Sequence, residues 1–189
     1  PTPKPAYSKN TVGYLTVPGV DVTDEPILQH PTDDDYYLTH NEFDRESIWG
    51  AYFVPSEWNV SNVDDMYRVT VIFGHSNGNS MHKKFSVLKY FRDVNFAKEH
   101  RYIYLTLGEQ QTRWKIFAVA DYPIDPSYTI ANPDDSYFLT EIASMKAYSY
   151  NQYATKVGLN DKVLILSTCS GSDNYDTRFI VCAKLDEVF

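Results

Sequence analysis

Residues 162–185 read KVLILSTCSGSDNYDTRFIVCAKL and hold both cysteines of the chain. Two apolar runs, residues 163–166 and 179–183, lie on either side of a loop of small, polar and acidic residues. Apolar runs of this length, bounded by turn residues, are typical of buried strands. We therefore expect a hairpin-like pair of strands at residues 162–169 and 177–185, with Cys169 ending the first strand and Arg178 near the start of the second.

The rest of the chain is also organised mainly as strands. Apolar patterning predicts six more of them, at residues 12–18, 20–28, 49–54, 67–75, 102–107 and 112–120. Helical spacing or capping residues predict helices at residues 33–38, 85–91 and 136–153, the last being a long helix between the sixth and seventh strands. About eight strands with a few inserted helices favour a mainly β fold, and a closed or nearly closed eight-stranded barrel over a sandwich.

The composition favours a single strand-rich domain and argues against some classes of partner. A chain of 189 residues suits one domain with a full hydrophobic core, and 16 Tyr and 10 Phe against 8 Gly favour strands. The net charge of −8, with no clustered basic segment, argues against a nucleic-acid partner. No window approaches the roughly 18 to 20 apolar residues that span a bilayer. Residues 1–10 carry Pro and Lys without a signal-peptide core, so we interpret them as a linker.

Cys169 and His75 both stand where an apolar strand enters a small, polar loop. The thiolate is the attacking species in thiol catalysis, and a neighbouring imidazole generates it and later protonates a leaving amine. Arg178 comes close to facing Cys169 across the expected strand pair, with fixed donors for an oxyanion. The alternatives are a structural thiol, a hydrogen-bonded histidine and an ion pair of Arg178 with Asp173 or Asp176. The three residues together favour catalysis.

The order of several short motifs resembles that of the sortases, the Cys/His/Arg transpeptidases of Gram-positive cell surfaces. Leu166-Ser-Thr-Cys169 followed by Arg178 is similar to the L-x-T-C and R signature of that family, and Phe73-Gly-His75 resembles its G-H strand end. Further segments match in the same order, namely Val12-Gly-Tyr-Leu-Thr-Val-Pro-Gly19, Pro26-Ile-Leu-Gln29, Asp35-Tyr-Tyr-Leu38, Trp49-Gly-Ala-Tyr-Phe53 and Phe179-Ile-Val-Cys-Ala-Lys-Leu185. The long insertion between residues 120 and 162 is most similar to class B members.

This resemblance implies a sortase-type β-barrel over residues 11–189. Residues 1–10 would then be the remnant of a linker after a missing N-terminal membrane anchor. It implies a protein at the extracellular face of the cell membrane, or the cell surface, of a Gram-positive bacterium, with that anchor as its only contact with the membrane.

The resemblance also implies a reaction. Cys169 attacks the carbonyl after threonine in a sorting signal near the C-terminus of a surface protein and forms a thioester. His75 protonates the departing amine and then helps to deprotonate the incoming amine of a peptidoglycan precursor, while Arg178 holds the substrate and its oxyanion. No metal or organic cofactor is required. The acidic residues 33–35 could bind calcium, but we favour their interpretation as the solvated start of a helix.

Four residues are candidates for substrate binding. Ser167 and Thr168 lie on the strand that ends at Cys169, and we expect them to line the groove. Tyr128 and Ile130, in the long loop, are expected to contact the apolar part of the sorting signal. The alternative for all four is packing within the strand or the loop.

The second cysteine, Cys182, is expected to be free and structural. If Cys169 faces Arg178, then Cys182 pairs near Ile165, about 13 Å away along the strand. A disulfide needs Cα atoms within roughly 7 Å.

Three other functions remain open. A hydrolytic cysteine peptidase is less favoured, because papain-like chains place the cysteine before the histidine and here His75 precedes Cys169. A pilin-polymerising sortase would use a lysine of a subunit as the acceptor. A catalytically idle surface-binding barrel would need none of the three residues.

Overall fold

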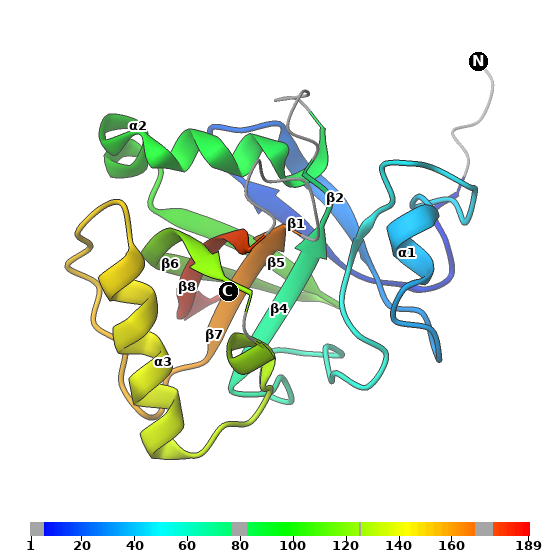
Figure 1. The fold of residues 1–189 in the computed structure, drawn as a ribbon. Coiled ribbons are helices and arrows are strands. Elements are labelled where there is room, and N and C mark those ends of the chain that lie inside the picture. Colours follow the sequence, from blue (N-terminus) through cyan, green and yellow to red (C-terminus); the bar gives the residue numbers. More distant parts are fainter. Residues whose placement is uncertain (1–5, 77–82, 125, 169–175) are drawn as a thin grey trace.

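The computed structural model describes residues 6–76, 83–124, 126–168 and 176–189, without the side chains of residues 126 and 127. Eight strands in this part of the chain form a closed barrel in the order β1-β2-β3-β4-β7-β8-β6-β5 (Figure 1). The strands are β1 (Thr11–Val17), β2 (Val22–Leu28), β3 (Tyr52–Phe53), β4 (Val69–Gly74), β5 (Tyr102–Leu107), β6 (Gln110–Pro123), β7 (Val163–Thr168) and β8 (Thr177–Val188). The predicted eight-stranded, mainly β fold is therefore confirmed.

Helical segments connect the strands. They are α1 (Tyr36–Thr39), the 3₁₀ helices η1 (Lys84–Arg92) and η2 (Pro126–Thr129), α2 (Val94–Glu99) and α3 (Asp135–Tyr148). In Figure 1, α1 lies at one side of the barrel, α2 lies at its top and α3 covers the opposite flank. The predicted long helix between the sixth and seventh strands is α3.

Two parallel pairings distinguish this barrel from a simple up-and-down meander. β3 runs parallel to β2, and β4 runs parallel to β7, whereas the other neighbours are antiparallel. A parallel pair brings the carboxyl ends of both strands to the same rim, although here the two strands are far apart in sequence. This pairing positions the candidate site.

The strands around β7 bury both of their faces. Leu164, Leu166 and Val181 point into the core inside the barrel, whereas Ile165 and Cys182 join a second core beneath α3. All six residues of β7 are buried. A strand that is covered on both faces needs no alternation with polar residues, which explains the continuous apolar run at residues 163–166.

Helix α3 is capped and then stopped by contacts with the sheet. The side chain of Asp134 accepts a hydrogen bond from the amide of Tyr137, as expected for an N-cap. The helix ends at Tyr148, not at the predicted residue 153. The amide of Tyr150 instead donates to the carbonyl of Val119 on β6, and the Ser149 hydroxyl accepts from the Val119 amide. Hydrogen bonds to the sheet therefore replace the last helical turn.

The other differences from the predicted elements have local causes. The strand predicted at residues 49–54 is reduced to Tyr52–Phe53, because Gly50 takes a positive φ of 54° in a turn. Residues 85–91 form part of a 3₁₀ helix, not an α-helix. Helix α2 was not predicted, although the Asp93 carboxylate caps it by accepting from two backbone amides. β6 continues to Pro123 because β8 pairs with it over that length.

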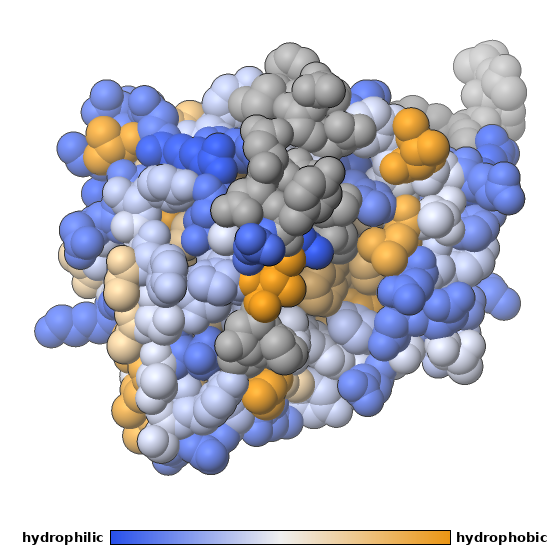
Figure 2. All heavy atoms as spheres, in the orientation of Figure 1, coloured by the Kyte–Doolittle hydropathy of each residue, from blue (hydrophilic) through white to orange (hydrophobic). Residues whose placement is uncertain are grey.

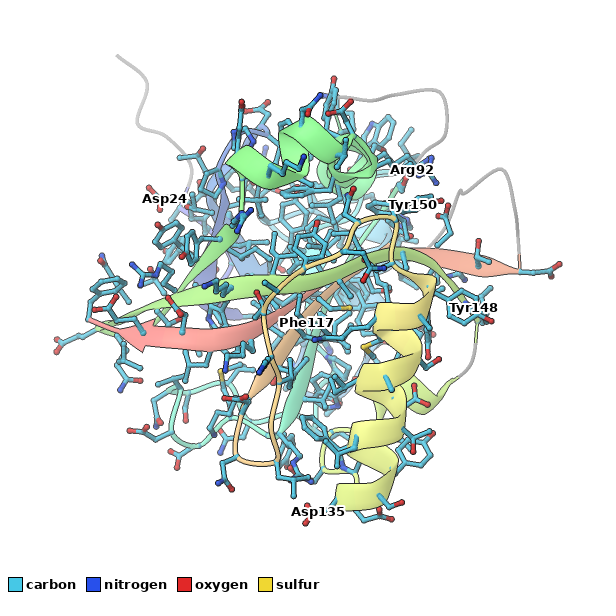
Figure 3. The ribbon with its side chains drawn as sticks, turned by 90° about the vertical axis from the view of Figure 1, so that its left-hand side faces the viewer. Asp24, Arg92, Phe117, Asp135, Tyr148 and Tyr150 are labelled. Atoms are coloured by element: carbon cyan, nitrogen blue, oxygen red, sulfur yellow. The ribbon has the colours of Figure 1, made fainter. Side chains whose placement is uncertain are left out.

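A three-residue contact ties the segment after α3 to the barrel. Arg92, at the end of η1, donates to both carboxylate oxygens of Asp121 on β6, at 2.9 and 2.6 Å. The hydroxyl of Tyr150 donates to the same carboxylate. Figure 3 shows Arg92 and Tyr150 close together above the end of α3 that carries Tyr148. We call these three residues the Asp121 clamp.

Among the helices in the described ranges, none combines the length and the apolar character that crossing a membrane requires.

Candidate active site

The candidate site lies at the rim where β4 and β7 end side by side. Their parallel register pairs Phe73 with Ser167 and Gly74 with Thr168. His75 directly follows β4. In sequence, Cys169 directly follows β7, but it lies outside the described residues, as do Ser170 to Tyr175. The described register therefore brings together the two strand ends that lead to the predicted histidine and cysteine.

His75 is held by the backbone of the α1 region. Its Nε2 lies 2.6 Å from the carbonyl oxygen of Leu38, which directly precedes Thr39, the last residue of α1. A carbonyl oxygen only accepts hydrogen bonds, so Nε2 carries a proton and donates it. In the neutral imidazole the other ring nitrogen, Nδ1, is therefore the basic atom. The site thus defines which nitrogen of His75 gains and loses a proton.

Glycine at position 50 permits this placement of the imidazole. A Cβ atom at Gly50 would lie 3.0 Å from Cδ2 of His75 and 2.2 Å from the carbonyl oxygen of Tyr37. The backbone there also has a positive φ of 54°, which disfavours other residues. The amide of Phe85 donates to the carbonyl of His75 at 2.9 Å and ties the residue to η1.

Arg178 reaches the same rim from β8, where it pairs with Tyr122 of β6. It is half-buried, and its Nη1 donates to the carbonyl of Thr177 at 3.4 Å. Within the described ranges, no carboxylate lies within 4.0 Å of the guanidinium, so the alternative ion pair with Asp176 is absent. Asp173 lies among the residues that the structure does not describe.

Arg178 lines a groove of about 270 Å³ between the barrel rim and the α1 region. The apolar part of the lining is Leu38, Phe53, Pro55 and Phe73, and two carboxylates, from Asp34 and Asp35, lie beside it. Figure 2 shows orange and tan atoms in the hollow between the middle of this face and the side that carries α1. The groove therefore combines an apolar wall with one cation and two carboxylates.

Ser167, Thr168 and Tyr128 have buried side chains. The hydroxyls of Tyr128 and Ser167 lie 3.1 Å apart and share a hydrogen bond. The Thr168 hydroxyl oxygen accepts from the amide of Phe179 at 3.0 Å. These contacts fasten β7 to η2 and β8 close to the rim, and a substrate-binding role for the three residues stays a prediction.

Ile130 follows η2 and is 43% exposed. Together with Tyr128 it lines a narrow gap against α3, not the groove that contains Arg178. The structure thus places Tyr128 beside Ser167 and leaves Ile130 on the surface, and the predicted contact of Ile130 with a sorting signal stays a prediction.

Cys182 has the surroundings of a structural thiol. It is fully buried and pairs with Ile165, the register that the sequence predicted. It forms no disulfide. Burial strongly raises the pKa of its thiol, so the thiol stays protonated and unreactive at neutral pH.

Two features of the site were not predicted from the sequence. The carbonyl of Leu38 as the partner of His75 has no side-chain signature, because any residue supplies a backbone carbonyl. The apolar wall is formed by Phe53 and Phe73 from neighbouring strands, and their rings stack at 5.7 Å. The signal available in the sequence was that Phe73 ends the apolar run of residues 71–73 and that Phe53 lies one residue before the end of the run of residues 51–54.

Metal-binding geometry is not apparent at the acidic run. In the part of the chain that the structure describes, no group of three or more His, Cys, Asp or Glu side chains is arranged to hold a metal ion. Two of the carboxylates at residues 33–35 are engaged locally, since Asp33 accepts from the Asp35 amide and Asp34 accepts from the Ser56 amide.

Comparisons with known proteins identify relatives of the whole chain. No family model matches it. Sortase B of Listeria monocytogenes serovar 1/2a is 28% identical over 180 residues, which cover 94% of this chain and 70% of that protein. A solved structure of sortase B from Listeria monocytogenes superposes with a TM-score of 0.79 at 28% identity, covering 94% of this chain and 95% of that one. A Staphylococcus aureus sortase B–substrate complex has a TM-score of 0.83 at 20% identity, covering 96% and 82%.

Proposed function

We propose a specific reaction, on the premise that the chain is a sortase most similar to the class B members and hence a cysteine transpeptidase. The chain cleaves the C-terminal sorting signal of a substrate protein after threonine. It then transfers that substrate protein to a peptidoglycan amine. The observation that carries the proposal is the parallel β4–β7 pairing, which ends at Gly74 and Thr168 immediately before His75 and Cys169.

The first half of the proposed reaction breaks the scissile amide. The Cys169 thiolate attacks the carbonyl carbon of the threonine, and the oxygen becomes an oxyanion that the Arg178 guanidinium stabilises. As the C–N bond breaks, protonated Nδ1 of His75 gives its proton to the departing amine, while Nε2 keeps its bond to the Leu38 carbonyl. The product is a thioester and a free amine.

The second half restores the thiol. Nδ1 of His75 takes one proton from the neutral acceptor amine as the amine nitrogen attacks the thioester carbonyl. A new amide forms and the Cys169 thiolate leaves. No net oxidation or reduction occurs, so the residues of the chain suffice for the reaction.

The groove beside Arg178 is the proposed place for the sorting signal. Its apolar wall, formed by Leu38, Phe53 and Phe73, lies next to the carbonyl that holds His75. A Staphylococcus aureus sortase B with the same fold has been solved as a substrate complex, and this supports the proposal of a substrate site on the present chain. We propose that the partners are sorting-signal-bearing proteins and a peptidoglycan precursor, at the outer face of a Gram-positive membrane reached through an N-terminal anchor.

The test uses a peptide library of sorting signals with triglycine as the amine acceptor. We expect an acyl adduct on Cys169 by mass spectrometry and an amide-linked product with triglycine. Cys169→Ala should abolish both, whereas Cys182→Ala, the matched control, should retain both. Hydrolysis without transfer would instead indicate a peptidase. Transfer only to a lysine-bearing pilin peptide would indicate a polymerising sortase. The absence of any adduct would indicate a binding module.

A further inference from the structure

A second cavity lies far from the rim, between α2, the β5–β6 pair and the segment that follows α3. Its volume is about 210 Å³. Lys115, which lines it, is seven residues from Tyr122 on β6, about 23 Å along an extended strand. Because Tyr122 pairs with Arg178, the cavity is separated from the candidate active site by most of the length of the barrel. We call it the α2 cleft.

Cations from three parts of the chain converge on the α2 cleft. Lys98 comes from α2, Arg101 from the turn before β5 and Lys115 from β6. No Asp or Glu side chain lines the cleft, although the whole chain carries a net charge of −8. In the described ranges, none of the three cations is within 4.0 Å of a carboxylate. The three positive charges are therefore not neutralised within the described part of the protein.

Two of these cations are held in place. Nε of Arg101 donates to the carbonyl of Lys98 at 3.0 Å, which fixes the guanidinium at the end of α2. Lys115 is half-buried, and its Nζ lies 6.0 Å from the centroid of the Tyr102 ring. Positioned cations lose less conformational entropy when a ligand binds, so they form a better anion site than lysines free in solvent.

The other wall of the α2 cleft supplies uncharged donors. Asn151, Gln152 and Tyr153 belong to the segment that Figure 3 shows leaving the upper end of α3 and passing Tyr150. The amide of Asn151 donates to the carbonyl of Phe91 at 3.1 Å, which fixes the segment against η1. This wall is therefore attached to η1, which is followed almost directly by α2, the helix that carries Lys98.

The hydroxyl of Tyr153 is buried near the Asn151 side chain, but neither Asn151 nor any other described residue forms a hydrogen bond of normal length and angle with it. Burial raises the pKa of this phenol to about 12, while the neighbouring Asn151 amide and Arg101 charge act in the opposite direction. A buried hydroxyl without an acceptor is unfavourable, so a small shift of the Tyr153 ring that brings its hydroxyl to a ligand in the cleft would satisfy this donor.

We propose that the α2 cleft binds a phosphate monoester group through Lys98, Arg101 and Lys115, with Tyr153 as an additional donor. A carboxylate offers one charge and two oxygens, which would leave the three cations largely uncompensated. A phosphate monoester carries about −1.5 to −2 charges and three terminal oxygens. The cleft is open to solvent and apolar at Val94 and Ala97, which leaves room for the group esterified to the phosphate.

The test is a titration of the isotope-labelled protein with sn-glycerol 3-phosphate, followed by NMR, with glycerol as the matched ligand control. We expect saturable shifts of the amides of residues 94–101 and 151–155 with the phosphate ester and none with glycerol. Lys115→Gln and Arg101→Gln should each weaken binding about tenfold, because each removes a charge-assisted hydrogen bond. The same spectra report whether each variant is folded.

The control variant is Lys156→Gln, which makes the same change in net charge at an exposed residue directly after the cleft. Its affinity should stay within about twofold of that of the parent protein, since screened surface charges contribute little. Equal weakening by Lys156→Gln, or shifts that do not saturate, would overturn the proposal in favour of nonspecific attraction.

Vesicles then distinguish a lipid headgroup from a soluble ester as the source of the phosphate. Co-sedimentation with vesicles of phosphatidylcholine and phosphatidic acid that is lost in Lys115→Gln would assign the site to a lipid headgroup. Retained binding of glycerol phosphate without co-sedimentation would assign it to a soluble ester. Either result supports the site, and neither depends on the transpeptidase reaction, so this proposal and the proposed function fail separately.

Discussion

The middle of the β7–β8 pair differs from its rim end, although the same two strands form both. In the middle, Ile165 faces Cys182, and both side chains are fully buried beneath α3. At the rim, Arg178 is half-exposed and lines the groove, and His75 stands beside the end of β7. The environment along the strand therefore separates an inert thiol at position 182 from the place proposed for a reactive one.

This comparison teaches why a rigid barrel suits acyl transfer. The buried middle supplies the packing that fixes the register, and the register determines which side chains meet at the rim. The strand residues that line the groove, Phe53, Phe73 and Arg178, all lie within two residues of a strand end, and His75 directly follows one. Substitutions at the two places should therefore have opposite consequences, with loss of activity at the rim and loss of stability in the middle.

The largest effect is expected at His75. His75→Ala should lower kcat/KM for transfer by about 10²- to 10⁴-fold, because proton transfer to the leaving amine is lost. His75→Gln is the matched variant, since its longer amide can keep a donor near the position of Nε2 for the Leu38 carbonyl but does not titrate near neutral pH. Both variants should fail alike in a coupled peptide assay and keep the parent circular dichroism. Transfer at the parent rate by either variant would refute the catalytic assignment.

The second-largest effect on transfer is expected at Arg178. Arg178→Ala should reduce kcat by about 10²- to 10³-fold if the guanidinium stabilises the oxyanion. Arg178→Lys keeps the charge without the planar pair of donors and should recover only part of the loss. Steady-state kinetics would distinguish this role from substrate binding alone, because a change confined to KM would leave kcat at the parent value.

Cys182→Ala tests the buried half of the comparison. It should leave the transfer rate within about twofold and lower the free energy of unfolding by about 1 kcal/mol, through the lost packing of one heavy atom. Urea unfolding monitored by fluorescence measures the stability. A loss of transfer as severe as in Cys169→Ala would show that the thiol at position 182 is not inert.

The difference in unfolding free energy between the parent protein and Cys182→Ala should also depend on pH. Burial raises the pKa of the Cys182 thiol above its unfolded value, so the unfolded state releases the proton first as the pH rises. The stabilisation is complete below the unfolded pKa, near 8.5, and declines above it by at most about 1.4 kcal/mol per pH unit. Between about pH 8 and pH 10 the parent protein should therefore lose its stability advantage of about 1 kcal/mol over Cys182→Ala and become the less stable of the two. A difference that stays constant over this range would contradict the burial of the thiol.

A small effect on both stability and transfer is expected at the Asp121 clamp, which lies between the two regions. Asp121 pairs with Phe179, the neighbour of Arg178, so Arg92→Gln should loosen the start of β8. We expect a loss of about 1 kcal/mol in stability and about a threefold lower transfer rate. Arg113→Gln is the control, since Arg113 also pairs with carboxylates from β8, Asp186 and Glu187, but at the far end of β6. Equal effects of the two variants on transfer would exclude a role in positioning Arg178.

Much of the fold followed from local patterns. The apolar run at residues 163–166 identified β7, and the Ile165–Cys182 register followed from placing Cys169 opposite Arg178. Helical spacing and capping residues identified α3, which Asp134 caps and which buries Phe138, Ile142 and Met145. These features depend on residues near one another in the chain, where periodicity and capping act directly.

Where prediction failed, distant contacts outweighed local preference. Helix α3 ends early because Val119, about 30 residues away, offers its backbone to Ser149 and Tyr150. The strand predicted from residue 49 begins only at Tyr52, since the turn at Gly50 packs against Tyr37 and His75. Helix α2 was available to prediction through the N-cap at Asp93, but its short length gave no periodic signal.

The sequence by itself determined the strands, their order along the chain and the three residue types suited to thiol catalysis. Only the tertiary structure decided that β4 lies parallel to β7, that the Leu38 carbonyl orients His75, and that an apolar groove opens beside Arg178. The physical reason is that side-chain patterns encode which faces are buried. Backbone hydrogen bonds between distant segments use groups that every residue shares, so they leave no mark in the sequence.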